Sequence, residues 1–183
     1  MHDDSVGAAD VGWFADAVGR NDGEAAFLER LRQLSPGWSV AGLSERDTSS
    51  LAAMVPLFVD VEVPGLPIPR RMLQVGYWTG GYYERALQGV WGDSYLLDDH
   101  DGNDAEDLTV VGVRASHEQH AEWAADWFLR QLRRPVVRQE WLRRDRVVAA
   151  RWRLDDTGRV LGTRGRDLRR LFGGAPDRVV PVR

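Results

Sequence analysis

Arginine and tryptophan are interleaved through the last third of this 183-residue chain, and both side chains suit binding chemistry. Arginines on an exposed sheet face could contact phosphates while aromatic rings stack on bases, which would bind nucleic acid. The same two residue types are enriched in the hot spots of protein–protein interfaces. The segment therefore predicts a surface for one of these two partner classes. Its residues are Arg138, Arg143, Arg144, Arg146, Arg151, Arg153, Arg159, Arg164, Arg166, Arg169 and Arg170, with Trp141 and Trp152.

The number of arginines is weaker evidence for a binding surface than their positions in the sequence. All 24 basic residues are arginine, Ile68 is the only isoleucine, and Asn21 and Asn103 are the only asparagines. Lysine, isoleucine and asparagine have AT-rich codons, so a GC-rich bacterial genome explains the bias without any polyanionic ligand. A sequence pI of about 5.6 also argues against nucleic acid as the partner.

The charge is divided unevenly along the chain. Residues 1–115 hold 8 Arg and 19 Asp or Glu, a net charge of -11, whereas residues 116–183 hold 16 Arg and 9 Asp or Glu, a net charge of +7. Such a division predicts either two binding faces of opposite sign or two halves that neutralise each other in the fold.

Metal chemistry has two candidate segments, and neither matches a known pattern. His117 and His120 give the sequence H-E-x-H, whereas zinc proteases use H-E-x-x-H, and nothing in the sequence places His100 near them as a third ligand. The acidic loop 98–107 fails the EF-hand template, because placing Gly102 at the loop glycine puts leucines at the first and last ligand positions. We therefore predict no metal site, with a looser cation site in this loop left open.

Catalytic motifs are absent from the sequence. The chain has no cysteine and no lysine, which removes disulfides, thiolate metal sites, cysteine nucleophiles and Schiff-base chemistry. It also lacks the G-x-S-x-G, Walker A and G-x-G-x-x-G patterns. Asp155 and Asp156 are paired carboxylates in a predicted hairpin turn, where a structural role explains them. We predict no catalytic residue and no cofactor; an enzyme with scattered residues in a cleft beside the helix 117–134 is an alternative.

The helix expected over 117–134 is the clearest element that could position these residues. Ser116 and Gln119 form a capping-box pattern, apolar residues recur at helical spacing, and Pro135 ends the segment. Two N-terminal helices are predicted over 8–19 and 22–34, and a last short helix over 166–172.

Alternating apolar residues predict strands joined by short turns. The turns include Gly80-Gly81 and Arg144-Asp145, and a helix over 82–90 is an alternative to the strand there. In the strand 146–154, Trp152 is predicted on an inner face joined by Val137 and Trp141, with Arg151 and Arg153 on the outer face. The expected strands are 38–43, 57–63, 71–79, 82–91, 108–113, 136–143, 146–154 and 159–163.

These elements predict an α+β fold: a mainly antiparallel sheet with hairpin connections, covered by one strong amphipathic helix (117–134) and N-terminal helices. We expect a single domain over 1–183, with a helical N-terminal segment (1–35), an α+β core (36–172) and a loose C-terminal tail (173–183). The acidic N-terminus and the lack of a long apolar run predict a soluble, cytoplasmic protein with no membrane partner.

The functional prediction is a non-enzymatic protein-binding module of a bacterial system, either immunity- or antitoxin-like or an adaptor in an assembly. Its expected partner-binding residues are Arg143, Arg144, Arg151 and Arg153. The first alternative is an arginine-rich sheet face that binds nucleic acid, and the second is the enzyme with a cleft. The sequence leaves the oligomeric state and the identity of the partner open.

Overall fold

The computed structural model describes residues 12–52, 55–68, 72–79, 85–92, 106–165 and 174–183. The predicted turn at Gly80-Gly81, the helix over 166–172, His100 and most of the acidic loop lie outside these residues. The described elements are α1 (Asp22–Leu34), η1 (Ser35–Gly37), η2 (Glu45–Asp47), β1 (Thr48–Leu51), β2 (Leu57–Glu62), β3 (Met72–Tyr77), β4 (Arg85–Trp91), β5 (Leu108–Val111), α2 (His117–Leu132), β6 (Val136–Arg143), β7 (Arg146–Leu154), β8 (Val160–Gly165) and β9 (Arg178–Pro181).

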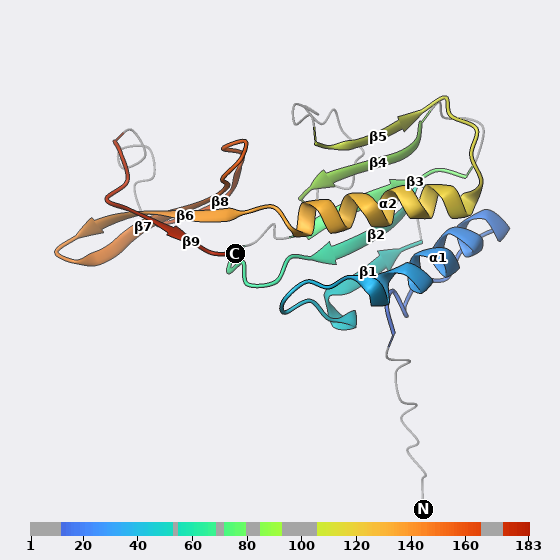
Figure 1. Cartoon of the computed structure of the whole chain (residues 1–183), viewed down its shortest axis with the longest axis horizontal. Helices are drawn as coiled ribbons and strands as arrows, with labels where there is room; N and C mark the ends of the chain where they lie inside the picture. Colours follow the sequence, from blue (N-terminus) through green and yellow to red (C-terminus); the bar gives the residue numbers. More distant parts are fainter. Residues whose placement is uncertain (1–11, 53–54, 69–71, 80–84, 93–105, 166–173) are drawn as a thin grey trace, which may run out of the picture.

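The α+β class is confirmed, but the strands form two antiparallel sheets instead of one (Figure 1). The first, sheet A, has the order β1-β2-β3-β4-β5, so each strand pairs with the next along the chain. The second, sheet B, has the order β8-β7-β6-β9 and follows directly after α2. Figure 1 shows β6 and β7 extending away from the helices and from sheet A.

Both helices pack on the same face of sheet A and run parallel to each other. The first turns of the two helices are in contact, because the His117 ring lies against the backbone of Gly23. Further along both helices, Arg30 of α1 donates a hydrogen bond to Glu122 of α2. Alternation in β2 and β3 places one set of apolar side chains beneath the helices, so Tyr77 stacks on Phe27 with ring centroids 4.3 Å apart. Among the described residues, no helix is long and apolar enough to cross a membrane.

The covering layer differs in part from the strong helix (117–134) and N-terminal helices that the sequence predicts. α1 and α2 share it, and α2 ends at Leu132, two residues before the predicted end. A helix was expected over 8–19, but in its described part residues 13–16 form a turn and 17–19 have no regular structure. The segment predicted as a strand over 38–43 is not one. The turn before α1 is held by hydrogen bonds to a residue distant in sequence. The Arg32 guanidinium, on α1, donates to the carbonyl oxygens of Phe14 and Ala17.

Sheet B includes a strand in the segment that was expected to be a loose tail. β9 pairs antiparallel with β6, with Arg138 opposite Val180 and Glu140 opposite Arg178. Its four residues end in Pro181, which suits an edge strand because proline has no N–H to donate. The C-terminal segment therefore contributes side chains to sheet B.

The β6–β7 hairpin confirms the predicted turn but reverses one prediction about its faces. Arg144 and Asp145 have φ values of 51° and 59°, as a tight two-residue hairpin turn requires. One extra residue on β7 then forms a bulge, so Trp141 pairs with Ala149 instead of Val148. A shift by one residue moves a side chain to the other face. Trp141 therefore lies on the face of Arg151, and the predicted shared inner face with Trp152 is wrong.

Candidate functional site

A groove of about 410 Å³ lies on one face of sheet B. Strands β6, β7 and β8 provide most of its lining, and Pro67 from the segment between β2 and β3 contributes to it. The lining combines apolar residues with two arginines and one glutamate. Its residues are Pro67, Arg138, Glu140, Val147, Val148, Ala149, Ala150, Trp152, Arg164 and Gly165.

The β7 bulge and the glycine opposite it shape this groove. Gly165 pairs with Ala149 and has a φ of +132°, a conformation that residues with a Cβ rarely adopt. A Cβ at this position would lie 2.5 Å from the carbonyl oxygen of Val148. The backbones of β7 and β8 therefore approach each other more closely than any larger residue would allow.

Glu140 carries the only buried charge among the groove-lining residues, with 1% of its side chain exposed. The Arg138 guanidinium lies 2.5 Å from one carboxylate oxygen, and the Arg178 Nε donates to the other at 2.7 Å. Burial alone would raise the pKa of Glu140, but the hydrogen bond from Arg178 and the charges of both arginines outweigh it and lower the pKa. The groove thus contains an ionised carboxylate that its own neighbours neutralise.

The structure does not bring the four arginines predicted to bind a partner into one patch. Arg143 and Arg144 are exposed at the hairpin tip, and no described carboxylate lies within ion-pair distance of either. Arg151 lies over the Trp141 ring, 5.4 Å from its centroid, and Arg153 lies 3.9 Å from Asp155. The tip arginines are available to a partner, whereas the other two make contacts within the chain; the binding role of all four stays a prediction.

The two tryptophans of this segment are too buried to stack on nucleic-acid bases. Trp141 and Trp152 are 6% and 3% exposed. Arg159, another residue of the predicted basic surface, pairs with Asp107 at 3.0 Å, and Arg166, Arg169 and Arg170 lie outside the described residues. The nucleic-acid interpretation thereby loses the aromatic part of its chemistry.

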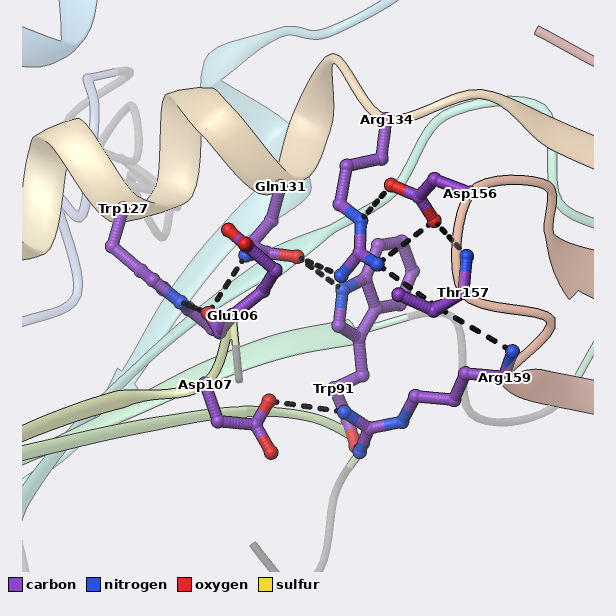
Figure 2. Close-up of polar contacts among 9 residues, drawn as sticks. All are labelled: Trp91, Glu106, Asp107, Trp127, Gln131, Arg134, Asp156, Thr157 and Arg159. Atoms are coloured by element: carbon purple, nitrogen blue, oxygen red, sulfur yellow. Dashed lines mark hydrogen bonds and ion pairs between the residues drawn. The ribbon is translucent and has the colours of Figure 1, made fainter. Parts of the chain in front are cut away.

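A buried polar network joins sheet B to the end of α2 and to sheet A (Figure 2). Arg134, which is 8% exposed, donates to both carboxylate oxygens of Asp156, at 2.8 and 2.9 Å, and to the Thr157 hydroxyl at 3.0 Å. It also donates to Gln131 Oε1 at 2.9 Å, and the Trp91 indole donates to the same oxygen at 2.8 Å. The turn Asp155–Gly158 is thus fixed to the core, which is the structural role predicted for this carboxylate pair.

The two histidines of the H-E-x-H segment have separate partners. His117 Nδ1 lies 2.5 Å from the Tyr77 hydroxyl, and His120 Nδ1 lies 2.7 Å from the Ser116 carbonyl oxygen. Burial, followed by the negative charges of Glu24 and Glu118, raises the pKa of Tyr77 to about 12. The described residues include no group of three or more His, Cys, Asp or Glu side chains arranged to hold a metal.

The cleft required by the enzyme alternative is filled with side chains. Trp127, Phe128 and Leu132 project from α2 towards sheet A, and all three are fully buried. The space between this helix and the sheet is therefore part of the hydrophobic core.

Sequence reasoning missed Glu140 as a member of the groove and Arg178 as its ion-pair partner. Glu140 alternates with Val136 and Arg138 along β6, but only the bulged pairing with β7 places it on the same face as Trp152. Arg178 had no comparable signal, because only pairing with β6 brings it near. Comparison of the chain with protein-family models, curated protein sequences and solved structures gave no match.

Proposed function

We propose that this chain is a non-enzymatic protein-binding module of a bacterial system, of the antitoxin-like or adaptor type, and that sheet B contacts the partner. The observation that carries the proposal is the β6–β7 hairpin, which extends from the body of the molecule (Figure 1). Its tip combines exposed arginines that have no ion-pair partner among the described residues with exposed valines. We call this surface the basic tip and define it as residues 143–148.

The charge of the basic tip favours an acidic partner. Arg143, Arg144 and Arg146 are exposed, and Asp145 is the one acidic residue among them. Within the part of the chain that the structure describes, no ion pair involves these three arginines. A complementary acidic surface would be drawn to this tip, because opposite potentials steer association.

Apolar exposure next to these charges favours protein over nucleic acid. Val147 and Val148 are 47% and 36% exposed, and both line the groove that continues from the tip. Burying such side chains stabilises a complex through the hydrophobic effect, which a phosphate backbone would not provide. An acidic protein segment that carries apolar residues matches both features.

Charge reversal tests the proposal directly. We expect R143E/R144E/R146E to lose a specific protein that the wild-type chain captures from extracts of its source cells. The matched control R46E/R114E/R133E changes the net charge equally at exposed arginines outside sheet B and should retain it. If both variants lose the captured protein equally, net charge alone explains the effect. If both retain it equally, the basic tip is not the binding surface. Retention of oligonucleotides by the wild type, abolished by the tip variant alone, would favour nucleic acid instead.

A further inference from the structure

Two residues that line the groove, Arg138 and Trp152, each have a buried N–H donor without an acceptor among the described residues: Arg138 Nε and Trp152 Nε1. Arg138 and Trp152 occupy directly opposed positions on β6 and β7, so both donors belong to one cross-strand pair. Buried donors are almost always hydrogen-bonded in folded proteins, and leaving one unpaired is costly. Two at one place therefore point to an acceptor that is supplied from outside the chain.

We propose that the groove is a carboxylate-binding subsite, and that it takes an aspartate or glutamate side chain from the partner's acidic segment. This proposal rests on the proposed function, because it names the chemistry by which sheet B would recognise its protein partner. Trp152 is 97% buried, so its unpartnered indole is an internal feature of the groove and not a group that bulk solvent satisfies.

Charge selects an anion for this place. Arg138 and Arg178 both contact Glu140, and one carboxylate therefore faces two arginines. Arg164 lines the groove from β8, is exposed, and pairs with no described carboxylate. The three arginines and one glutamate leave a net positive charge, which a second carboxylate would reduce.

The shape of the lining suits an amino-acid side chain. Arg138 contacts Glu140 through Nη2, and its Nε–H is a buried donor without an acceptor among the described residues. Pro67, Val148 and Ala150 supply apolar surface beside these donors, against which the methylene groups of a glutamate would pack. A ligand carboxylate would then accept from Trp152 and Arg138 while Arg164 closes over it.

The indole N–H resonance of Trp152 reports on this subsite in two-dimensional NMR spectra of the full chain, with W152F used to assign it. The probes are the capped peptide acetyl-Ala-Glu-Val-Glu-Ala-amide and its glutamine counterpart. We expect the acidic peptide to shift the Trp152 resonance with saturation, and the glutamine peptide to leave it in place. The Trp91 resonance, whose N–H bonds Gln131, should stay unchanged and reports that the fold is intact.

Variants locate the binding. R164Q should weaken the acidic peptide about tenfold, the loss expected for one charged hydrogen bond, whereas R114Q, at an exposed arginine outside sheet B, should not. No shift at about 10 mM peptide, or equal shifts with both peptides, would overturn the carboxylate subsite. An equal shift with inorganic phosphate would also overturn it, because the groove would then be a general anion site. Each of these failures leaves the charge-reversal result at the basic tip unaffected, so the two proposals fail separately.

Discussion

Replacing Arg134 by methionine tests whether the polar network in Figure 2 holds sheet B to the core. The substitution keeps a long apolar side chain but removes the four hydrogen bonds from Arg134 to Asp156, Thr157 and Gln131. The Asp156 side chain is 41% exposed and regains water, while Gln131 keeps its bond from Trp91. The uncompensated loss is therefore close to two charged hydrogen bonds, or about 3 kcal/mol.

Urea denaturation measures this loss. With a slope of about 2 kcal/mol per molar urea, the midpoint should fall by about 1.5 M. R133M is the matched control, because Arg133 is the exposed neighbouring arginine and its loss should cost less than about 0.5 kcal/mol. Equal midpoints for R134M and R133M would refute the network as the element that joins the two sheets.

The pH dependence of R134M gives a second readout of the same interaction. The hydrogen bond from Arg134 lowers the pKa of Asp156 despite the opposing effect of burial. A carboxyl whose pKa is depressed by folding contributes stability above its unfolded pKa and loses it as the pH falls through the folded value. R134M should therefore lose less stability on acidification than the wild type, and an unchanged acid dependence would contradict the assignment.

Three further predictions concern single residues. E140Q should lower the free energy of unfolding by only about 1–3 kcal/mol, since Arg138 and Arg178 are partly exposed and regain water. It should also reduce the loss of stability at acidic pH, because folding lowers the pKa of Glu140. Y77F should reduce the loss of stability between pH 10 and about 12, because a Tyr77 pKa raised to about 12 favours the fold below pH 10 and ceases to do so as the pH rises through the folded value. In thermal unfolding, G165A should lower the free energy of unfolding by more than about 2 kcal/mol and G158A by about 1 kcal/mol. Both glycines have a positive φ, but of the two only Gly165 would place a Cβ against backbone atoms. Equal losses would contradict the close approach of β7 and β8.

Local sequence signals determine much of sheet B. The bounds of β6 and β7 agree with the prediction, because both strands alternate cleanly and a two-residue turn joins them. The capping box at Ser116 and Gln119 likewise begins α2 where expected. These elements depend on interactions between residues close in sequence, which periodicity and turn chemistry detect.

Long-range pairing determines the parts that the sequence did not reveal. The division into two sheets depends on which edges pair, and nothing local distinguishes one five-stranded meander and a second sheet from a single larger sheet. The bulge opposite Trp141 lies in the pairing of β6 with β7, and it alone moves Trp141 to the face of Arg151. Arg178 joins Glu140 only through β9, which lies 38 residues further along the chain.

The same distinction applies to the candidate site. Exposed Arg143 and Arg144 at the hairpin tip follow from the turn, which the sequence predicts. The groove follows from the register, from Gly165 and from the burial of Glu140, none of which has a signature in one strand alone. Sequence reasoning therefore predicted exposed arginines at the hairpin tip but did not find the pocket beside them.

Amide hydrogen exchange on the complex of this chain with its captured partner is the most direct test of sheet B as the binding surface. We predict that the partner slows exchange in the hairpin tip and along β7 and β8, residues 143–165, and leaves the exposed faces of α1 and α2 unchanged. Protection confined to the helices or to sheet A, with residues 143–165 exchanging as in the free chain, would contradict the account.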